Sequence, residues 1–432
     1  MTNTGFERDR GEFARGAKAV VVLPDQGGAT RDAEARLEET AGLAEAIGVT
    51  VTERHLVRVR QPRPATLIGS GQVDQIAAIV RDEGLELAVF DAQLTPIQQR
   101  NLETALECKV IDRTGLILEI FGERARTAEG RLQVELAHLD YQSGRLVRSW
   151  THLERQRGGF GFLGGPGETQ IEADRRLIRD RMARLRRELE GVSRTRTLHR
   201  DRRQRAPWPI VALVGYTNAG KSTLFNRLTG AAVLAEDMLF ATLDPTLRQI
   251  SLPGIDKAIL SDTVGFVSDL PTQLVAAFRA TLEEVASADL LVHVRDIAHP
   301  DTQAQADDVE AVLAELGVQA ETPRIEAWNK LDLLDGDVRE QMLSDAERRH
   351  DVVAISALGG EGVDTLIRTV ADRLTASHRR YSVTLDPADG AGAAWLHAHG
   401  EVLDQWVEDG GVHYEIRMDP ADWERFASRQ AD

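Results

Sequence analysis

The fold is decided by the stretch Ile210-Val-Ala-Leu-Val-Gly215-Tyr-Thr-Asn-Ala-Gly220-Lys221-Ser222-Thr223. Its first five residues are apolar and predict a buried strand, and a helix is expected to follow through Arg227. Between them stands the pattern G-x-x-x-x-G-K-S, whose glycines let backbone N–H groups turn towards the α- and β-phosphates of a nucleotide. Lys221 is expected on the β/γ oxygens and the Ser222 hydroxyl on Mg²⁺. The stretch therefore predicts a nucleotide-binding α/β domain.

A second motif is expected beside the phosphates. Residues 258–260 (AIL) predict a strand that leads into Asp262-Thr-Val-Gly265. Asp262 would hold Mg²⁺ through water, and the Gly265 N–H would sense a γ-phosphate. Two further strands, residues 325–328 and 352–355, lead to Asn329-Lys-Leu-Asp332 and to Ser356-Ala-Leu358.

These last two segments predict a guanine site. The Asp332 carboxylate can accept hydrogen bonds from guanine N1–H and the 2-amino group, and adenine offers neither donor. Asn329 would support the base edge, the Lys330 stem would cover the base, and the backbone of Ser356-Ala-Leu358 would meet O6. Four motifs in this order indicate a guanine-nucleotide site rather than a glycine turn capping a helix.

Between the first two motifs lies Phe240-Ala-Thr-Leu-Asp-Pro-Thr246. A threonine here would close on Mg²⁺ when a γ-phosphate is present; Thr242 is our choice and Thr246 the alternative. We expect catalytic roles for Lys221, Thr242, Asp262 and Gly265, and metal contacts from Ser222 and Thr242. The full set expected around the nucleotide is Gly215, Tyr216, Thr217, Asn218, Ala219, Gly220, Lys221, Ser222, Thr223, Phe240, Ala241, Thr242, Leu243, Asp244, Asp262, Thr263, Val264, Gly265, Asn329, Lys330, Leu331, Asp332, Ser356, Ala357 and Leu358.

Two positions bear on the hydrolysis rate. Phe266 follows Gly265 where a glutamine would orient the attacking water, so another group must do so, or hydrolysis is slow until a partner supplies one. Asn218 stands where several GTPases use an asparagine to hold a monovalent cation, so K⁺ is expected to accelerate hydrolysis more than Na⁺.

The remainder of the 432-residue chain suggests further domains. Strand candidates at residues 17–23, 85–90 and 110–111 alternate with helical patterns at 31–47 and 95–106, as in a parallel sheet covered by helices. Leu132, Leu136 and Leu139 recur at helical spacing, as do Ile178, Met182, Leu185 and Leu189, on either side of the glycine-rich residues 158–167. This pattern predicts two antiparallel helices joined by a glycine-rich tip.

Charge is segregated along the chain. The net charge of −17 would disfavour nucleic acid, but residues 171–205 hold 13 arginines against six acids and no lysine. That segment carries +7, which leaves −24 for the rest. An ordinary solvated helix face is the alternative, but arginines beside a glycine-rich tip favour an arm that binds phosphate groups.

We expect an α/β fold class: a P-loop GTPase domain (206–378) preceded by an α/β N-terminal domain (1–112) with a helical hairpin arm (113–205), plus a small α+β C-terminal domain (379–432). The single cysteine, Cys108, excludes an intrachain disulfide and a zinc site with several thiolates. Residues 1–16 lack the apolar core of a secretion signal, and no stretch approaches the ~20 apolar residues that span a membrane. We expect a cytoplasmic monomer.

The motifs GYTNAGKST, FATLDPT, DTVGF and NKLD together resemble those of the HflX family of translational GTPases. Residues 90–103 (FDAQLTPIQQRNLE), 112–121 (DRTGLILEIF) and 165–170 (GPGETQ) are similar to the family's upstream signatures. The similarity runs roughly from residue 17 to 378, and such proteins often carry a short C-terminal unit.

The resemblance implies an Mg-dependent GTPase that binds the large ribosomal subunit and promotes splitting and recycling of stalled or idle ribosomes, notably under stress. It implies that the N-terminal domain and arm lie on ribosomal RNA, with the tip towards the peptidyl-transferase centre. The alternative is a ribosome assembly or silencing factor that uses GTP as an occupancy signal.

Two departures from the family pattern matter. Some members are reported to use ATP through the N-terminal domain, but Gly69-Ser-Gly-Gln72 lacks a P-loop lysine, so we expect a turn that opens a helix. Many relatives have an arginine just before Gly-Pro-Gly, whereas this tip reads Phe162-Leu-Gly-Gly-Pro166. Phe160 and Phe162 would either stack on splayed bases or pack against the hairpin.

Overall fold

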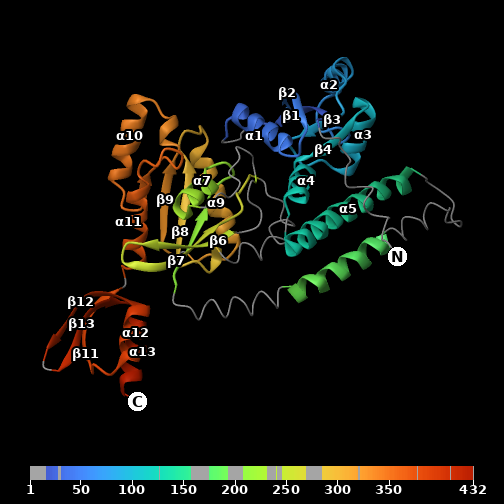
Figure 1. The fold of residues 1–432 in the computed structure, drawn as a ribbon. Coiled ribbons are helices and arrows are strands. Elements are labelled where there is room, and N and C mark those ends of the chain that lie inside the picture. Colours follow the sequence, from blue (N-terminus) through green and yellow to red (C-terminus); the bar gives the residue numbers. More distant parts are fainter. Residues whose placement is uncertain are drawn as a thin grey trace.

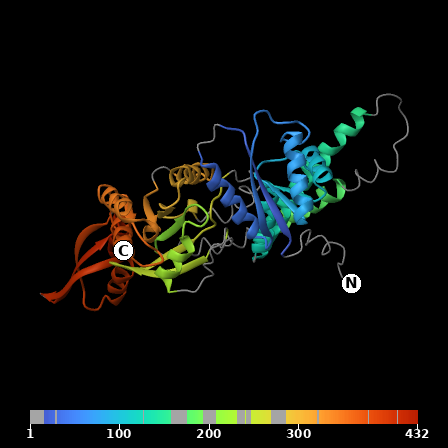
Figure 2. The same cartoon turned by 90° about the horizontal axis from the view of Figure 1, so that it is seen from above.

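A computed structural model gives the fold and describes residues 16–27, 31–125, 127–156, 175–192, 208–230, 240, 246–268, 285–319, 322–376, 378–408 and 410–431. Three folded units follow one another along an elongated molecule (Figure 1). The view from above shows the nucleotide-binding unit between the N-terminal and C-terminal ones (Figure 2). The α/β fold class expected from the sequence is confirmed.

The N-terminal unit is a parallel four-stranded sheet in the order β2-β1-β3-β4. Its strands are β1 (Lys18–Asp25), β2 (Thr50–Arg58), β3 (Leu87–Phe90) and β4 (Lys109–Asp112), and its helices are α1 (Ala33–Glu45), α2 (Ser70–Glu83), α3 (Pro96–Leu106) and α4 (Arg113–Arg124). Because side chains alternate along a strand, Val21 of β1 packs with α1 and α4, and Val20 packs with α2 and α3 on the opposite face.

Strand β2 was not predicted. Its side chains are only partly buried because it lies at the sheet edge, so it lacks the continuous apolar run that reveals β1 and β3. The glycines at 69 and 71 do open a helix: Gln72 Oε1 accepts from the Gly69 N–H at 3.0 Å at the start of α2.

The arm contains α5 (Ala128–Gln156) and a second helix over residues 175–192, which runs back beside it (Figure 1). The predicted apolar seam holds them together: Leu139, Met182 and Leu185 are buried, and Leu132, Leu136 and Ile178 pack around them. The glycine-rich tip and the arginines beyond residue 192 lie outside the described residues.

The nucleotide-binding unit is a six-stranded sheet in the order β10-β9-β8-β5-β7-β6, in which only β6 is antiparallel to its neighbour. Its strands are β5 (Ile210–Val214), β6 (Thr246–Leu252), β7 (Ile255–Asp262), β8 (Leu290–Asp296), β9 (Arg324–Asn329) and β10 (Val352–Ala354). Its helices are α7 (Lys221–Thr229), α9 (Thr302–Glu315), the 3-10 turn η1 (Leu331–Leu333), α10 (Gly336–Glu347) and α11 (Val363–Leu374).

The C-terminal unit is a small antiparallel sheet in the order β11-β13-β12, as the α+β pattern predicted. It comprises β11 (Arg379–Leu385), α12 (Gly390–His399), β12 (Gly400–Glu408), β13 (Gly411–Met418) and α13 (Pro420–Ala431). Leu396, Ile416 and Phe426 lie in its separate core. Within the described part of the chain, no helix is long and apolar enough to cross a membrane.

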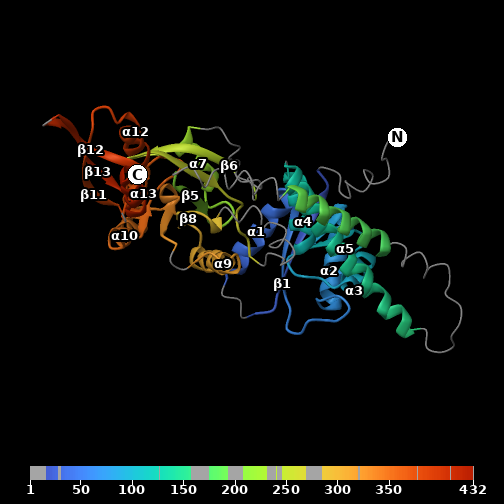
Figure 3. The same ribbon diagram turned by 90° about the horizontal axis from the view of Figure 1, so that it is seen from below.

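The N-terminal and nucleotide-binding units share one continuous core. Phe121 of α4 belongs to the same buried cluster as Val214 at the end of β5 and Val309 of α9. Helices α1 and α9 lie side by side when the molecule is seen from below (Figure 3). The domain interface is therefore packed like a protein interior.

Candidate guanine-nucleotide site

The phosphate loop, residues 215–220, joins β5 to α7, in the setting that the motif requires. Gly215 has φ 149° and Gly220 has φ 94°, so both adopt backbone conformations that side chains disfavour. A Cβ on Gly215 would lie 2.2 Å from the Val294 carbonyl oxygen, and one on Gly220 would lie 2.2 Å from Asn329 Nδ2. Glycine is thus required at both ends of the loop.

Lys221 lies at the first turn of α7 and is buried. Its Nζ donates to the carbonyl oxygens of Gly215 at 3.0 Å and Tyr216 at 2.7 Å, which keeps the ammonium group over the phosphate loop. Burial lowers the pKa of Lys221 to about 8, with the Asp262 carboxylate acting against that shift. An anionic phosphate would favour the charged form.

The two groups predicted to serve Mg²⁺ on the described chain lie together. The Ser222 hydroxyl donates to Asp262 Oδ2 at 2.8 Å, and the Asp262 side chain is buried at the end of β7. The hard oxygen ligands that Mg²⁺ prefers are therefore present at one point beside the phosphate loop. Next to them, Thr263 Oγ1 donates to the Leu213 carbonyl at 2.6 Å and ties the motif to β5.

Residues 262–268, which we call the switch segment, cross directly over the phosphate loop. The Phe266 N–H donates to the Gly215 carbonyl at 3.1 Å, and its carbonyl accepts from the Thr217 N–H at 2.7 Å. A Cβ on Gly265 would lie 2.8 Å from Thr217 Cγ2 and 3.1 Å from Lys221 Nζ. The backbone at Gly265 is thus close enough to sense what occupies this loop.

The Phe266 side chain is turned into the protein core. Its side chain is 1 % exposed in the core shared with the N-terminal unit, together with Phe121 and Phe240. The buried phenyl ring anchors the switch segment in the interface between the two units, and it supplies no polar group that could orient a water.

The expected guanine motif is held to the phosphate loop by Asn329. Its Nδ2 donates to the Ala219 carbonyl at 2.7 Å, and its Oδ1 accepts from the Ala357 N–H at 2.8 Å. Asn329 therefore joins two loops of the expected guanine site. Leu331 anchors the motif in the core, where it is fully buried.

The groups expected to meet the base surround this anchor. Ser356 Oγ donates to Asp332 Oδ1 at 2.5 Å, and Lys330 Nζ lies 2.8 Å from Asp296 Oδ2. Leu358 is 73 % exposed. Arg227, which sequence reasoning used only as a helix end, donates from Nε to the Ala357 carbonyl at 2.6 Å.

Not all predicted residues are placed. Ala241, Thr242, Leu243 and Asp244 lie outside the described residues, so the contact of Thr242 with Mg²⁺ stays a prediction. Phe240 is described; its ring meets the edge of Phe121 with centroids 4.7 Å apart. Asn218 is exposed with φ 58°, and Thr246, our alternative to Thr242, begins β6 opposite Asp262.

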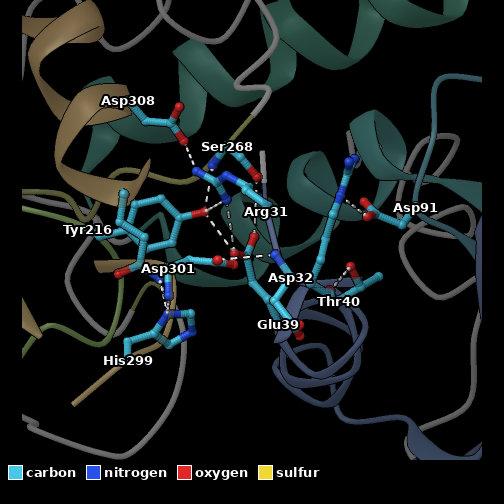
Figure 4. A network of polar contacts seen from close by, with 12 residues as sticks. Arg31, Asp32, Glu39, Thr40, Asp91, Tyr216, Ser268, His299, Asp301 and Asp308 are labelled. Carbon is cyan, nitrogen blue, oxygen red and sulfur yellow. Dashed lines mark hydrogen bonds and ion pairs between the residues drawn. The ribbon is translucent and has the colours of Figure 1, made fainter. Parts of the chain in front are cut away.

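One group of polar residues was not predicted. Arg31 and Glu39 of the N-terminal unit bind Tyr216 of the phosphate loop, as Figure 4 shows. Arg113 of the same unit binds Glu39 and also Ser268 of the switch segment. No sequence motif announces the contacts with the phosphate loop and the switch segment, because they join parts of the chain more than 100 residues apart.

A glycine loop with its lysine, a serine–aspartate pair beside that loop and an NKLD motif joined to it define a P-loop GTPase. Four family descriptions match in chain order: a GTP-binding GTPase N-terminal region over residues 34–122, a GTP-binding GTPase middle region over 124–203, a 50S ribosome-binding GTPase over 210–330 and an HflX C-terminal domain over 341–430.

Relatives match over nearly the whole chain. The GTPase HflX of Magnetococcus marinus is 51% identical over 389 residues, which cover 90% of this chain and 89% of the relative. The GTPase HflX of Escherichia coli is 44% identical over 395 residues, 91% and 92% of the two chains. The chain therefore belongs to the HflX family of GTPases, and the resemblance noted from its motifs is confirmed.

Among solved structures, a GTP-binding protein from Sulfolobus solfataricus in complex with GDP is 25% identical, with a TM-score of 0.46 over 83% of this chain and 99% of that one.

Proposed function

We propose that this GTPase binds the large ribosomal subunit through its arm and N-terminal domain and, with GTP bound, promotes the splitting and recycling of stalled or idle ribosomes. The observation that carries the proposal is the joining of a GTP site to an arginine-rich helix in one chain. The match of residues 210–330 to a 50S ribosome-binding GTPase and the HflX relatives support it.

The site supports Mg²⁺-dependent hydrolysis of GTP. Ser222 and Asp262 would hold the ion, directly and through water, and Thr242 would join it when a γ-phosphate is present. Mg²⁺ would neutralise charge that develops on the phosphate oxygens. Lys221 and the Gly265 N–H would bind the same oxygens, and Asn329 and Asp332 would select guanine.

A monovalent cation is the second proposed cofactor. Asn218 lies exposed in the phosphate loop, where its amide oxygen could contribute to a K⁺ site. Hydrolysis should be faster in K⁺ than in Na⁺ at equal ionic strength, and Asn218→Ala should remove the difference. Equal wild-type rates in the two salts would contradict this assignment.

The arm supplies the RNA-binding surface. In its second helix, Arg176, Arg179 and Arg184 are exposed. Exposed arginines along one helix suit the regularly spaced phosphates of RNA. We propose divisions near residues 112, 205 and 378, with α4 joining the first part to the arm, and a monomer that works in the cytoplasm.

Sedimentation with ribosomes tests the function. We expect the protein to pellet with large subunits in the presence of a non-hydrolysable GTP analogue, less so with GDP, and to convert 70S particles into subunits with GTP. Lys221→Ala should lose this nucleotide dependence. Absence of pelleting in every nucleotide state would overturn the proposal.

The alternative, a ribosome assembly or silencing factor, is favoured by Phe266, because slow intrinsic hydrolysis suits an occupancy signal. Turnover with and without subunits separates the two. Stimulation by ribosomes together with subunit release supports splitting, whereas tight GTP-dependent binding without either supports the alternative.

A further inference from the structure

Two consecutive residues, Asp112 and Arg113, lie where β4 ends and α4 begins, and both are 2 % exposed. Asp112 caps α4, since its Oδ1 accepts from the Gly115 N–H at 2.8 Å. The two side chains bind different parts of the molecule. This makes the junction a point through which distant elements are connected.

Asp112 binds the arm. The Tyr141 hydroxyl on α5 donates to Asp112 Oδ1 at 2.6 Å, and Arg145 Nη2 lies 2.7 Å from Oδ2. Gly115 makes room for this contact, because a Cβ there would lie 3.0 Å from the Tyr141 hydroxyl. Burial and the Asp112 carboxylate raise the pKa of Tyr141, so its phenol remains a hydrogen-bond donor.

Arg113 binds the switch segment. Its Nε and Nη2 donate to the Ser268 carbonyl at 3.2 and 3.1 Å, and Nη2 also donates to Ser268 Oγ at 2.7 Å. Asp91 and Glu39 each accept from the same guanidinium at 2.6 Å. Because the charge is buried, releasing any one partner would leave an uncompensated group.

The phosphate loop joins this cluster through Tyr216. Its hydroxyl accepts from the Ser268 N–H at 2.8 Å and donates to Glu39 Oε2 at 2.8 Å (Figure 4). Gly265, three residues before Ser268, is the group expected to sense the γ-phosphate. A shift of the switch segment must therefore either break a buried ion cluster or move the start of α4 with it.

We propose that Asp112 and Arg113 couple the nucleotide state of the switch segment to the position of the arm. Moving together preserves the buried contacts of Arg113, and Asp112 passes the displacement to Tyr141 and Arg145 on α5. The inference rests on the proposed function only for what the arm binds. It assigns positioning roles to two residues that contact no nucleotide.

Hydrogen exchange on the full-length protein tests the coupling without ribosomes. At saturating nucleotide, exchange of α5 peptides within residues 128–145 should differ about fivefold between a non-hydrolysable GTP analogue and GDP, as for modest coupling between sites. Arg113→Lys, which keeps the charge and loses the planar fork, should reduce this difference to less than about twofold. Tyr141→Phe, which removes the hydrogen bond from α5 to Asp112, should reduce the difference to the same extent.

A matched control and a double variant sharpen the test. Arg181→Ala breaks an arm ion pair with Glu135 outside this connection and should keep the difference. Combining Arg113→Lys with Tyr141→Phe should cost no more coupling than either alone, because both lie on one line of contacts. If Arg113→Lys does not fold, Tyr141→Phe carries the test.

A purely structural role would change exchange equally in the two nucleotide states. An α5 difference that is absent in the wild type, or retained in both variants, would overturn the proposal. Failure to bind ribosomes would instead remove the proposed function and leave the exchange result standing.

Discussion

Single residues in this site act on more than one loop. Asn329 bonds the phosphate loop through Nδ2 and the Ser356-Ala-Leu358 segment through Oδ1, so its amide holds the base and phosphate halves in register. Asp332 does not join these loops in this way. It is exposed, and its carboxylate accepts a hydrogen bond from the Ser356 hydroxyl. The structural role of Asn329 and the base selection predicted for Asp332 therefore fall on different residues of the same motif.

Replacing Asp332 by asparagine tests base selection. Since hydrogen bonds to a charged group contribute roughly 1.5–3 kcal/mol, Asp332→Asn should weaken GDP binding by about 10- to 100-fold. The ratio of GDP to ADP affinity should fall by a similar factor, measured by calorimetric titration. Asp337→Asn, an exposed carboxylate on α10, is the matched control and should leave the ratio unchanged. An unaltered ratio of GDP to ADP affinity in Asp332→Asn would mean that Asp332 does not select guanine.

The pH dependence of nucleotide binding tests Lys221. Burial lowers its pKa to about 8, so the side chain loses its proton above that pH, whereas a bound phosphate requires it. GDP affinity should therefore fall by up to about tenfold per pH unit above 8, with proton uptake on binding. Lys221→Arg, whose guanidinium stays charged, should lack this dependence. The two slopes, measured by titration between about pH 7 and 9.5, would coincide if Lys221 were not the titrating group.

At the scale of elements, the two helices of the arm are held together by a small apolar contact. Three buried residues, Leu139, Met182 and Leu185, join its two helices, and few apolar neighbours surround them. The N-terminal unit, in contrast, has a core on each face of its sheet. The second arm helix, residues 175–192, is thus the element whose packing can be disturbed without touching the core that carries the GTP site.

Leu185→Ala should loosen the second arm helix. Truncating a buried leucine typically costs about 2–5 kcal/mol, and Leu185 is 0 % exposed in this small cluster. We expect faster hydrogen exchange over residues 175–192 with unchanged GDP affinity. Leu177→Ala, at a leucine 65 % exposed on the same helix, is the control and should leave exchange unchanged. Equal protection in both variants would mean that the seam does not hold the arm.

At the scale of the whole molecule, charge and shape act together. The chain carries −17 overall, yet residues 171–205 carry +7. The described part of that segment, the helix over residues 175–192, lies beside α5 and away from the C-terminal unit (Figure 1). An acidic body with a basic arm would approach RNA in one orientation, because the rest of the surface is repelled.

Salt dependence of ribosome binding tests this arrangement. Replacing Arg175, Arg176, Arg179 and Arg184 by alanine should weaken binding and reduce the slope of log affinity against log salt by about 0.7–0.9 for each lost phosphate contact. Guanine-nucleotide affinity should stay the same. Four exposed arginines elsewhere, Arg348, Arg368, Arg380 and Arg425, form a matched control variant. Identical slopes for the two variants would mean that the arm arginines form an ordinary solvated helix face and do not bind RNA phosphates.

The sequence by itself determined the GTP site, because phosphate and guanine recognition depend on local motifs. Each of the four motifs follows a strand, so parallel strands bring Lys221, Asp262, Asn329 and Ser356 to one edge of the sheet. The arm seam was likewise readable, since the spacing of Ile178, Met182 and Leu185 is a property of one helix. Strand β2 was not predicted, because the partly exposed side chains of an edge strand leave no continuous apolar run in the sequence.

Only the tertiary structure decided how the GTP site meets the rest of the chain. The sequence shows Phe266 only as a missing glutamine. Its burial in one core with Phe121 depends on the packing of two domains. The sequence assigns no role to Arg113. The fold brings Ser268, 155 residues away, within hydrogen-bond distance of it. Local periodicity and motif spacing carry no information about such contacts, because they depend on the relative placement of whole domains rather than on the residues beside them.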